Sequence, residues 1–173
     1  MTLSHGDDFS IELTDNALVA EYVTRENQTT LIVVAPEGEE LFAATGEYVA
    51  FLDDDDTWLP EKLENQIQAM GRTGCGMSCT EALAGYGRRQ AGRKYDQFIY
   101  EYHFPFLKDK YLKHGLPLVD DIFPAIWNLD FIRIHNCCIT SSIIVKKDIF
   151  DKIKGMKHVE VGKEDYDCWL RLL

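Results

Sequence analysis

Residues 46–63 read GEYVAFLDDDDTWLPEKL, an apolar run that stops abruptly in four consecutive carboxylates. The run Tyr48 to Leu52 is short, unbroken and rich in aromatic and branched side chains, which favours a strand buried on both faces of a parallel sheet. Pro60 then suits the first turn of a helix, and apolar residues recur at helical spacing until Gly71. The four acids are therefore expected in a loop between a central strand and a helix.

The acid tetrad, Asp53 to Asp56, lies at the carboxyl end of the expected strand, where open α/β sheets bind their ligands. Adjacent carboxylates repel one another, and a bound cation reverses that repulsion. Ligands that are all oxygen select a hard ion, so we expect Mg²⁺ or Mn²⁺, which share their coordination sphere with substrate phosphates. The alternative is a solvated acidic turn, the usual meaning of a charge run. A buried strand that leads into the run makes this alternative the weaker one.

Two segments of the chain resemble one family. Residues 46–63 are similar to the metal-binding motif of family-two glycosyltransferases of the GT-A fold, in which a strand ending in an Asp-x-Asp (DXD) signature leads into Trp-x-Pro and a helix. The segment from Asn136 to Arg171, with Glu164-Asp165 near its end, is similar to the strand, helix and catalytic Glu-Asp motif of the same enzymes. The two matches occur in the family's order.

The resemblance implies an α/β fold with a GT-A-like (Rossmann-like), mostly parallel central sheet flanked by helices. A length of 173 residues with 46% hydrophobic content suits a single domain with a real core. We therefore expect one GT-A-like glycosyltransferase domain over residues 1–173. Its nucleotide and metal half would span about 1–80 and its acceptor half about 81–173.

The reaction that the resemblance implies is metal-dependent transfer of a sugar, of the hexosyltransferase type, with inversion at the anomeric carbon. The donor would be a nucleoside diphosphate sugar, with a UDP-sugar as the expected one, and the acceptor a hydroxyl of a carbohydrate or glycoconjugate. Such enzymes build polysaccharides or the glycans of glycoproteins. A divalent ion, Mn²⁺ or Mg²⁺, must neutralise the departing diphosphate, and a carboxylate must take the acceptor's proton.

The resemblance also assigns the donor side. It gives Asp55 to the metal, Asp53 to the metal and the ribose, and Asp54 to the nucleoside. An early strand of the family ends in polar residues that contact the nucleoside, and Asp15 is the candidate for that contact, although it is equally suited to cap the next helix. The family's opening strand, with its Pro-Thr-Tyr-like end, has no counterpart before Phe9, so a short natural version or a trimmed one is expected.

On the acceptor side, the resemblance makes Asp165 the general base, with Glu164 and Trp169 shaping the acceptor site. A carboxylate in the first turn of a helix feels the positive end of the helix dipole, which favours its ionised form. The alternative is that Asp165 only caps the helix. His135 either faces the site, as a ligand of metal or phosphate, or is a hydrogen-bonded structural histidine.

The segment Gly85 to Lys94 holds three glycines and four cations, which favours a mobile loop. Arg88 and its neighbours could pair with the donor diphosphate, or the segment could be a solvated turn. The aromatic-rich stretch from Tyr95 to Trp127 is expected to be mostly core. Elsewhere we expect strands at residues 9–13, 31–34, 75–80, 131–135 and 138–145, and helices at 16–26, 40–44 and 148–154.

Composition excludes several function classes. A net charge of -11 argues against nucleic acid and anionic membranes as partners, because a protein binds either of them through a basic surface. No apolar run approaches the roughly 20 residues of a membrane span, and no basic-then-apolar signal opens the chain. Five cysteines without such a signal favour reduced thiols and a cytoplasmic protein. A zinc site is a weaker hypothesis for these cysteines, because the adjacent pair Cys137-Cys138 does not match the usual spacing of zinc ligands.

Two other functions are compatible with parts of the sequence. A nucleotidyltransferase would also hold a metal-bound diphosphate on an α/β sheet, but its Gly-rich, basic phosphate loop is not visible near the first strand. The second alternative is a non-catalytic fragment that binds metal and nucleotide. Unlike an enzyme, it would not hydrolyse or transfer the sugar of the donor.

Overall fold

The computed structural model describes residues 2–4, 9–13, 17–23, 28–34, 46–53, 56–85, 90, 92–116, 118, 123–157, 159 and 163–173. The chain forms two compact units, each described here by itself. The first unit comprises Met1–Thr80 and Thr140–Leu172, and the second comprises Glu81–Ile139 with Leu173.

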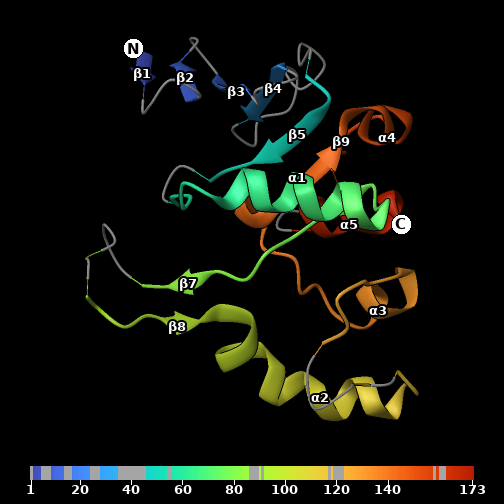
Figure 1. Ribbon diagram of the computed structural model, residues 1–173. Coiled ribbons are helices and arrows are strands. Elements are labelled where there is room, and N and C mark those ends of the chain that lie inside the picture. The colour runs from blue at the N-terminus through green and yellow to red at the C-terminus, as the bar shows by residue number, and fades with distance from the viewer. Residues whose placement is uncertain are drawn as a thin grey trace. The chain divides into compact units, whose positions relative to one another are not determined.

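A mixed sheet forms the centre of the first unit (Figure 1). Its strands are β1 (Thr2–Ser4), β2 (Phe9–Leu13), β3 (Ala17–Val23), β4 (Gln28–Val34), β5 (Tyr48–Phe51), β6 (Met77–Ser78) and β9 (Ile144–Lys146), in the order β1-β2-β3-β4-β5-β9-β6. The β4–β5 ladder is parallel, with Leu31 opposite Tyr48, and every other ladder of these strands is antiparallel. The α/β class is confirmed, but a mostly parallel central sheet is not. Short connections link β2, β3 and β4, and a parallel return would need about a dozen residues or more.

The structure corrects one prediction at the start of the sheet. Residues 16–26 were expected to form a helix, whereas Ala17–Val23 is the strand β3, paired with β2 on one side and β4 on the other. Its valine and tyrosine residues suit a strand as well as a helix face, and two neighbouring strands decide between them. The expected strands at 9–13 and 31–34 are confirmed, and the expected helix at 40–44 lies outside the described residues.

The central strand β5 is buried on both faces, as its apolar run predicts. Val49, Ala50 and Phe51 are at most 3% exposed. On one face, Ala50 of β5 and Ile144 of β9 join a core cluster with helix α1 (Lys62–Thr73), which contributes Leu63 and Met70. The helix follows the acid tetrad, as expected.

The other face of β5 is covered by α4 (Lys147–Lys152) and α5 (Glu164–Leu172). The Phe51 ring packs edge to face on Phe150 of α4, with centroids 5.7 Å apart, and on Trp169 of α5 at 5.3 Å. The helix α4 confirms the helix predicted at 148–154, although it ends at Lys152.

Two predicted strands are shorter than expected. Within residues 75–80 only Met77–Ser78 forms a strand, and within 138–145 a short 3₁₀-helix, η3 (Thr140–Ser142), precedes β9. All five cysteines are free thiols, as expected.

The second unit holds the hairpin β7 (Leu83–Ala84) and β8 (Asp96–Gln97), the π-helix η2 (Phe98–His103) and the helices α2 (Phe104–Lys113) and α3 (Leu129–Ile134). The prediction of a strand at 131–135 is wrong, because Asn128 begins a helix there by accepting the Phe131 N–H at 3.0 Å. The Tyr111 and Phe131 rings pack at a tilt with centroids 4.3 Å apart. The expectation that the aromatic stretch is mostly core is met only in part: Tyr111 and Phe123 are buried, whereas Phe98, Tyr100 and Phe106 are exposed. No helix in the described parts of either unit is long and apolar enough to cross a membrane.

Candidate active site

Asp53, the first member of the acid tetrad, is separated from the end of β5 by a single residue and is held by Ser141. The Asp53 N–H donates to Ser141 Oγ at 2.9 Å, and the same hydroxyl donates to Asp53 Oδ2 at 3.2 Å. Ser141 is only 6% exposed, whereas Asp53 is half-buried. One hydroxyl therefore fixes both the backbone and the carboxylate of Asp53.

Ser141 also holds the far end of the acidic loop, by which we mean residues 53–58. The indole Nε1 of Trp58 donates to the Ser141 carbonyl oxygen at 2.7 Å. Within the loop, the Asp56 N–H donates to the Asp53 carbonyl oxygen at 3.1 Å. Asp54 and Asp55 lie outside the described residues.

Asp165 lies in the first turn of α5 and contacts the residue next to Ser141. The Thr140 hydroxyl donates to Asp165 Oδ2 at 3.4 Å, and the Tyr166 N–H donates to Asp165 Oδ1 at 2.6 Å. The second bond satisfies an N–H group that has no partner within a helix, so the capping alternative keeps some support. The first bond ties the carboxylate to a separate element of the unit.

Consecutive residues of η3 thus contact Asp53 and Asp165. We call Thr140 and Ser141 the hydroxyl pair. Neither residue was predicted for the site, although the sequence carries a signal there, a run of three hydroxyl side chains, Thr140 to Ser142, inside an otherwise apolar stretch.

A buried polar network continues from the hydroxyl pair into α1. The Gln66 amide Nε2 donates to the Ser142 carbonyl oxygen at 2.8 Å and to Ser78 Oγ at 3.3 Å. Its Oε1 accepts from Lys62 Nζ at 2.7 Å, and that ammonium lies 4.4 Å from the centroid of the Trp58 ring. Burial lowers the pKa of Lys62 to about 7. The network connects the base of the acidic loop with the core.

The two remaining residues predicted on α5 differ in exposure. Glu164 is the first residue of the helix and is half-buried. Trp169 is fully buried against Phe51, so an acceptor could reach it only if the residues that cover it moved.

His135 follows α3 in the second unit, where its ring centroid is 5.8 Å from that of His103. Burial lowers the pKa of His135, and the nearby Lys110 and His103 lower it further. Asp15 and Arg88 lie outside the described residues. Of the loop that contains Arg88, the structure describes residues 85, 90 and 92–94, and the Gln90 N–H donates to the hydroxyl of Tyr95, just beyond the loop, at 2.8 Å.

Whether the acidic loop holds a metal depends on its carboxylates. Their oxygens fit Mg²⁺ or Mn²⁺, and the fixed carboxylate of Asp53 is one such donor. In the part of the chain that the structure describes, which omits Asp54 and Asp55, no group of three His, Cys, Asp or Glu side chains could hold a metal ion.

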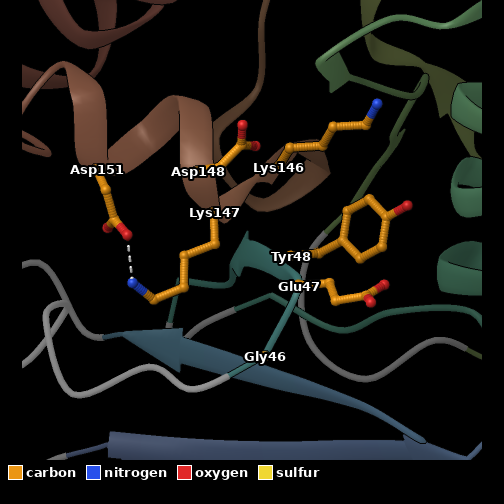
Figure 2. Close-up of a pocket in the computed structure, with 7 residues that line it drawn as sticks. All are labelled: Gly46, Glu47, Tyr48, Lys146, Lys147, Asp148 and Asp151. Carbon is orange, nitrogen blue, oxygen red and sulfur yellow. Dashed lines mark hydrogen bonds and ion pairs between the residues drawn. The ribbon is translucent and has the colours of Figure 1, made fainter. Parts of the chain in front are cut away.

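A pocket of about 440 Å³ lies at the opposite end of β5 (Figure 2). Its lining comprises Gly46, Glu47, Tyr48, Lys146, Lys147, Asp148 and Asp151. Figure 2 shows Lys147 turned toward Asp151, to which it is ion-paired at 2.6 Å. None of these residues was predicted for the site, and the pocket is separated from Asp53 by the length of the strand.

Comparison with known proteins identifies one family, whose match includes the acidic loop and η3 and ends before α5. The sequence model of "Glycosyl transferase family 2" matches residues 39–147. A curated relative, the "Putative teichuronic acid biosynthesis glycosyltransferase TuaG" of Bacillus subtilis (strain 168), is 45% identical over 58 residues. That alignment covers 33% of this chain and 21% of the relative, so the chain spans about a fifth of the relative's length. No solved structure matches the chain significantly.

Proposed function

Because the chain belongs to glycosyl transferase family 2, we propose that it is a metal-dependent, inverting glycosyltransferase. It transfers a sugar from a nucleoside diphosphate donor, for which we propose a UDP-sugar, to a hydroxyl of a carbohydrate or glycoconjugate. The family membership supports a nucleotide-sugar donor and an acceptor. The metal, the inversion and the identity of both substrates are part of the proposal.

The observation that supports this proposal most is the convergence of two carboxylates on the hydroxyl pair. Asp53 comes from the end of a strand and Asp165 from the start of a distant helix, and consecutive hydroxyls contact both. Inverting transfer needs a donor-side group and a base within reach of one sugar carbon. Contact with one turn keeps the two carboxylates in the same part of the unit, as the proposed roles require.

Each residue then has a role in the proposed reaction. Asp53 and Asp55 would hold the divalent ion, which supplies charge neutralisation for the departing diphosphate. The acceptor oxygen attacks the anomeric carbon while the bond to the diphosphate breaks, and the diphosphate keeps the electron pair. Asp165 takes the proton of the acceptor hydroxyl. Thr140 limits the directions in which that carboxylate can point.

Calorimetric titration of UDP with and without Mn²⁺ tests the donor side. We expect binding in Mn²⁺ that EDTA abolishes, and a loss of about tenfold or more in Asp53→Asn and Asp55→Asn, because each removes a charged ligand. Asp148→Asn is the control, since it removes an exposed carboxylate at the other end of the sheet. If neither EDTA nor either substitution changed UDP binding, the metal site would be refuted. If the protein bound UDP but did not turn over a donor, it would be a non-catalytic fragment.

A further inference from the structure

We propose that the hydroxyl pair positions the two reacting sides of the site, Ser141 the acidic loop and Thr140 the carboxylate of Asp165. This inference rests on the proposed function and deepens it, because it names residues that set the geometry without touching substrate. Neither residue carries a charge or belongs to the acidic motifs.

Ser141 makes three hydrogen bonds to the acidic loop and so holds both of its ends. Its hydroxyl has a single proton, which goes to Asp53 Oδ2, while a lone pair accepts the Asp53 N–H. Its carbonyl accepts the Trp58 indole N–H. Four neighbouring carboxylates repel one another, so a loop that carries them needs fixed ends to keep one arrangement before a cation binds. Ser141 supplies this restraint.

Thr140 acts on the other carboxylate. Its hydroxyl lies 3.4 Å from Asp165 Oδ2, longer than the roughly 2.5–3.0 Å of a typical O–H···O hydrogen bond, so the contact is weak and would shorten with a small movement of the carboxylate. The other oxygen, Oδ1, accepts the Tyr166 N–H at 2.6 Å. With both oxygens contacted from different elements, the plane of the carboxylate is restricted.

The backbone of the turn does not need these hydroxyls. The Ile143 N–H donates to the Thr140 carbonyl oxygen at 3.0 Å, and Gln66 Nε2 donates to the Ser142 carbonyl oxygen at 2.8 Å. These bonds fix η3 from its own backbone and from α1. Removing either hydroxyl should therefore release a carboxylate while the turn itself stays in place.

The Ser141 arm of the test is donor affinity. Ser141→Ala should weaken calorimetric binding of UDP with Mn²⁺ by about tenfold, since a lost hydrogen bond to a charged group typically costs that much. Ser141→Cys replaces the hydroxyl with a somewhat larger thiol, which is a weaker donor, and should also weaken UDP binding. It provides a second test if Ser141→Ala does not fold. Ser78→Ala is the control, because this hydroxyl belongs to the same network and contacts Gln66.

The Thr140 arm is turnover, measured as UDP released from a panel of UDP-sugars in Mn²⁺. Thr140→Val should lower kcat by about tenfold with the donor KM and UDP affinity within about twofold, because the base is misaligned and the donor side is untouched. Thr140→Ser keeps the hydroxyl and should restore the rate. If Thr140 had only a structural role, Thr140→Val would lower kcat and UDP affinity together, or would change neither.

The wild-type protein tests the proposed function, and the variants test the roles of Ser141 and Thr140. A wild-type protein that neither binds UDP with Mn²⁺ nor turns over a UDP-sugar refutes the proposed function and this inference with it. If the wild-type protein does both, and if Ser141→Ala binds UDP and Thr140→Val turns over a UDP-sugar as well as the wild type, only this inference is refuted.

Discussion

Lys62 is a residue whose ionisation the fold controls. Its ammonium donates to Gln66 and lies over the Trp58 ring, and burial lowers its pKa to about 7, with Cys79 acting in the opposite direction. In an unfolded chain the pKa of lysine is about 10.4. Between these values the unfolded chain binds more protons than the folded one, so stability rises with pH. Below about pH 7 both states are protonated and the cost of the buried charge is constant.

We therefore predict a pH dependence that belongs to Lys62. The free energy of unfolding should rise from pH 7 to pH 10 by on the order of a few kcal/mol in the wild type, and Lys62→Met should lose that rise. The variant also leaves Gln66 Oε1 unpaired, which costs about 1–3 kcal/mol at every pH, so the slope is diagnostic and the absolute value is not.

Urea unfolding at several pH values measures that slope. Lys152→Met is the control, since Lys152 is exposed and pairs with Asp148 on the surface. Parallel pH profiles for the wild type and Lys62→Met would show that Lys62 is not the titrating group.

At the scale of elements, the sequence predicted where α1 lies but placed its end too early. Gly71 was expected to end the helix, yet the helix continues to Thr73. Gly74 ends it, with a φ of 73° and an N–H that donates to the Met70 carbonyl oxygen at 2.9 Å. Both glycines fit a helix end, and only the backbone geometry tells them apart.

This difference gives a matched pair of substitutions. Gly71→Ala should stabilise the protein by about 0.5–1 kcal/mol, because a helical glycine is replaced by the best helix former and no atom lies within 4 Å of the new Cβ. Gly74→Ala also meets no atom, but its positive φ strains an L-residue, so we expect a loss of about 1 kcal/mol. Thermal unfolding of both variants checks this, and equal shifts would contradict the assignment of Gly74 as the helix end.

Elements without a distinctive motif were the ones predicted wrongly. The segment Ala17–Val23 is apolar enough for either a helix or a strand, and its pairing with β2 and β4 decides. The segment Leu129–Ile134 is equally ambiguous, and the cap provided by Asn128 decides for a helix. In both cases the deciding interaction lies outside the segment, so local composition could not supply it.

For the molecule as a whole, the sequence predicted the buried strand β5, the acidic loop after it and the helix that carries Asp165. It could do so because each has a local pattern: an unbroken apolar run, a charge run, and an acidic first turn. The hydroxyl pair was missed because its role depends on which carboxylates the fold brings to Thr140 and Ser141. The direction of the strands was missed because it follows from pairing partners and connection lengths.

The central claim is that Asp165 is the base of a reaction whose donor is held on the acidic loop. It is tested most directly by Asp165→Asn, a nearly isosteric change, assayed for both calorimetric affinity for UDP with Mn²⁺ and release of UDP from a panel of UDP-sugars. We predict that the variant keeps UDP affinity within about twofold and loses turnover by a factor of about 10² or more, as expected for a lost acid–base group. Turnover at the wild-type rate would contradict the account and would leave Asp165 as a helix cap.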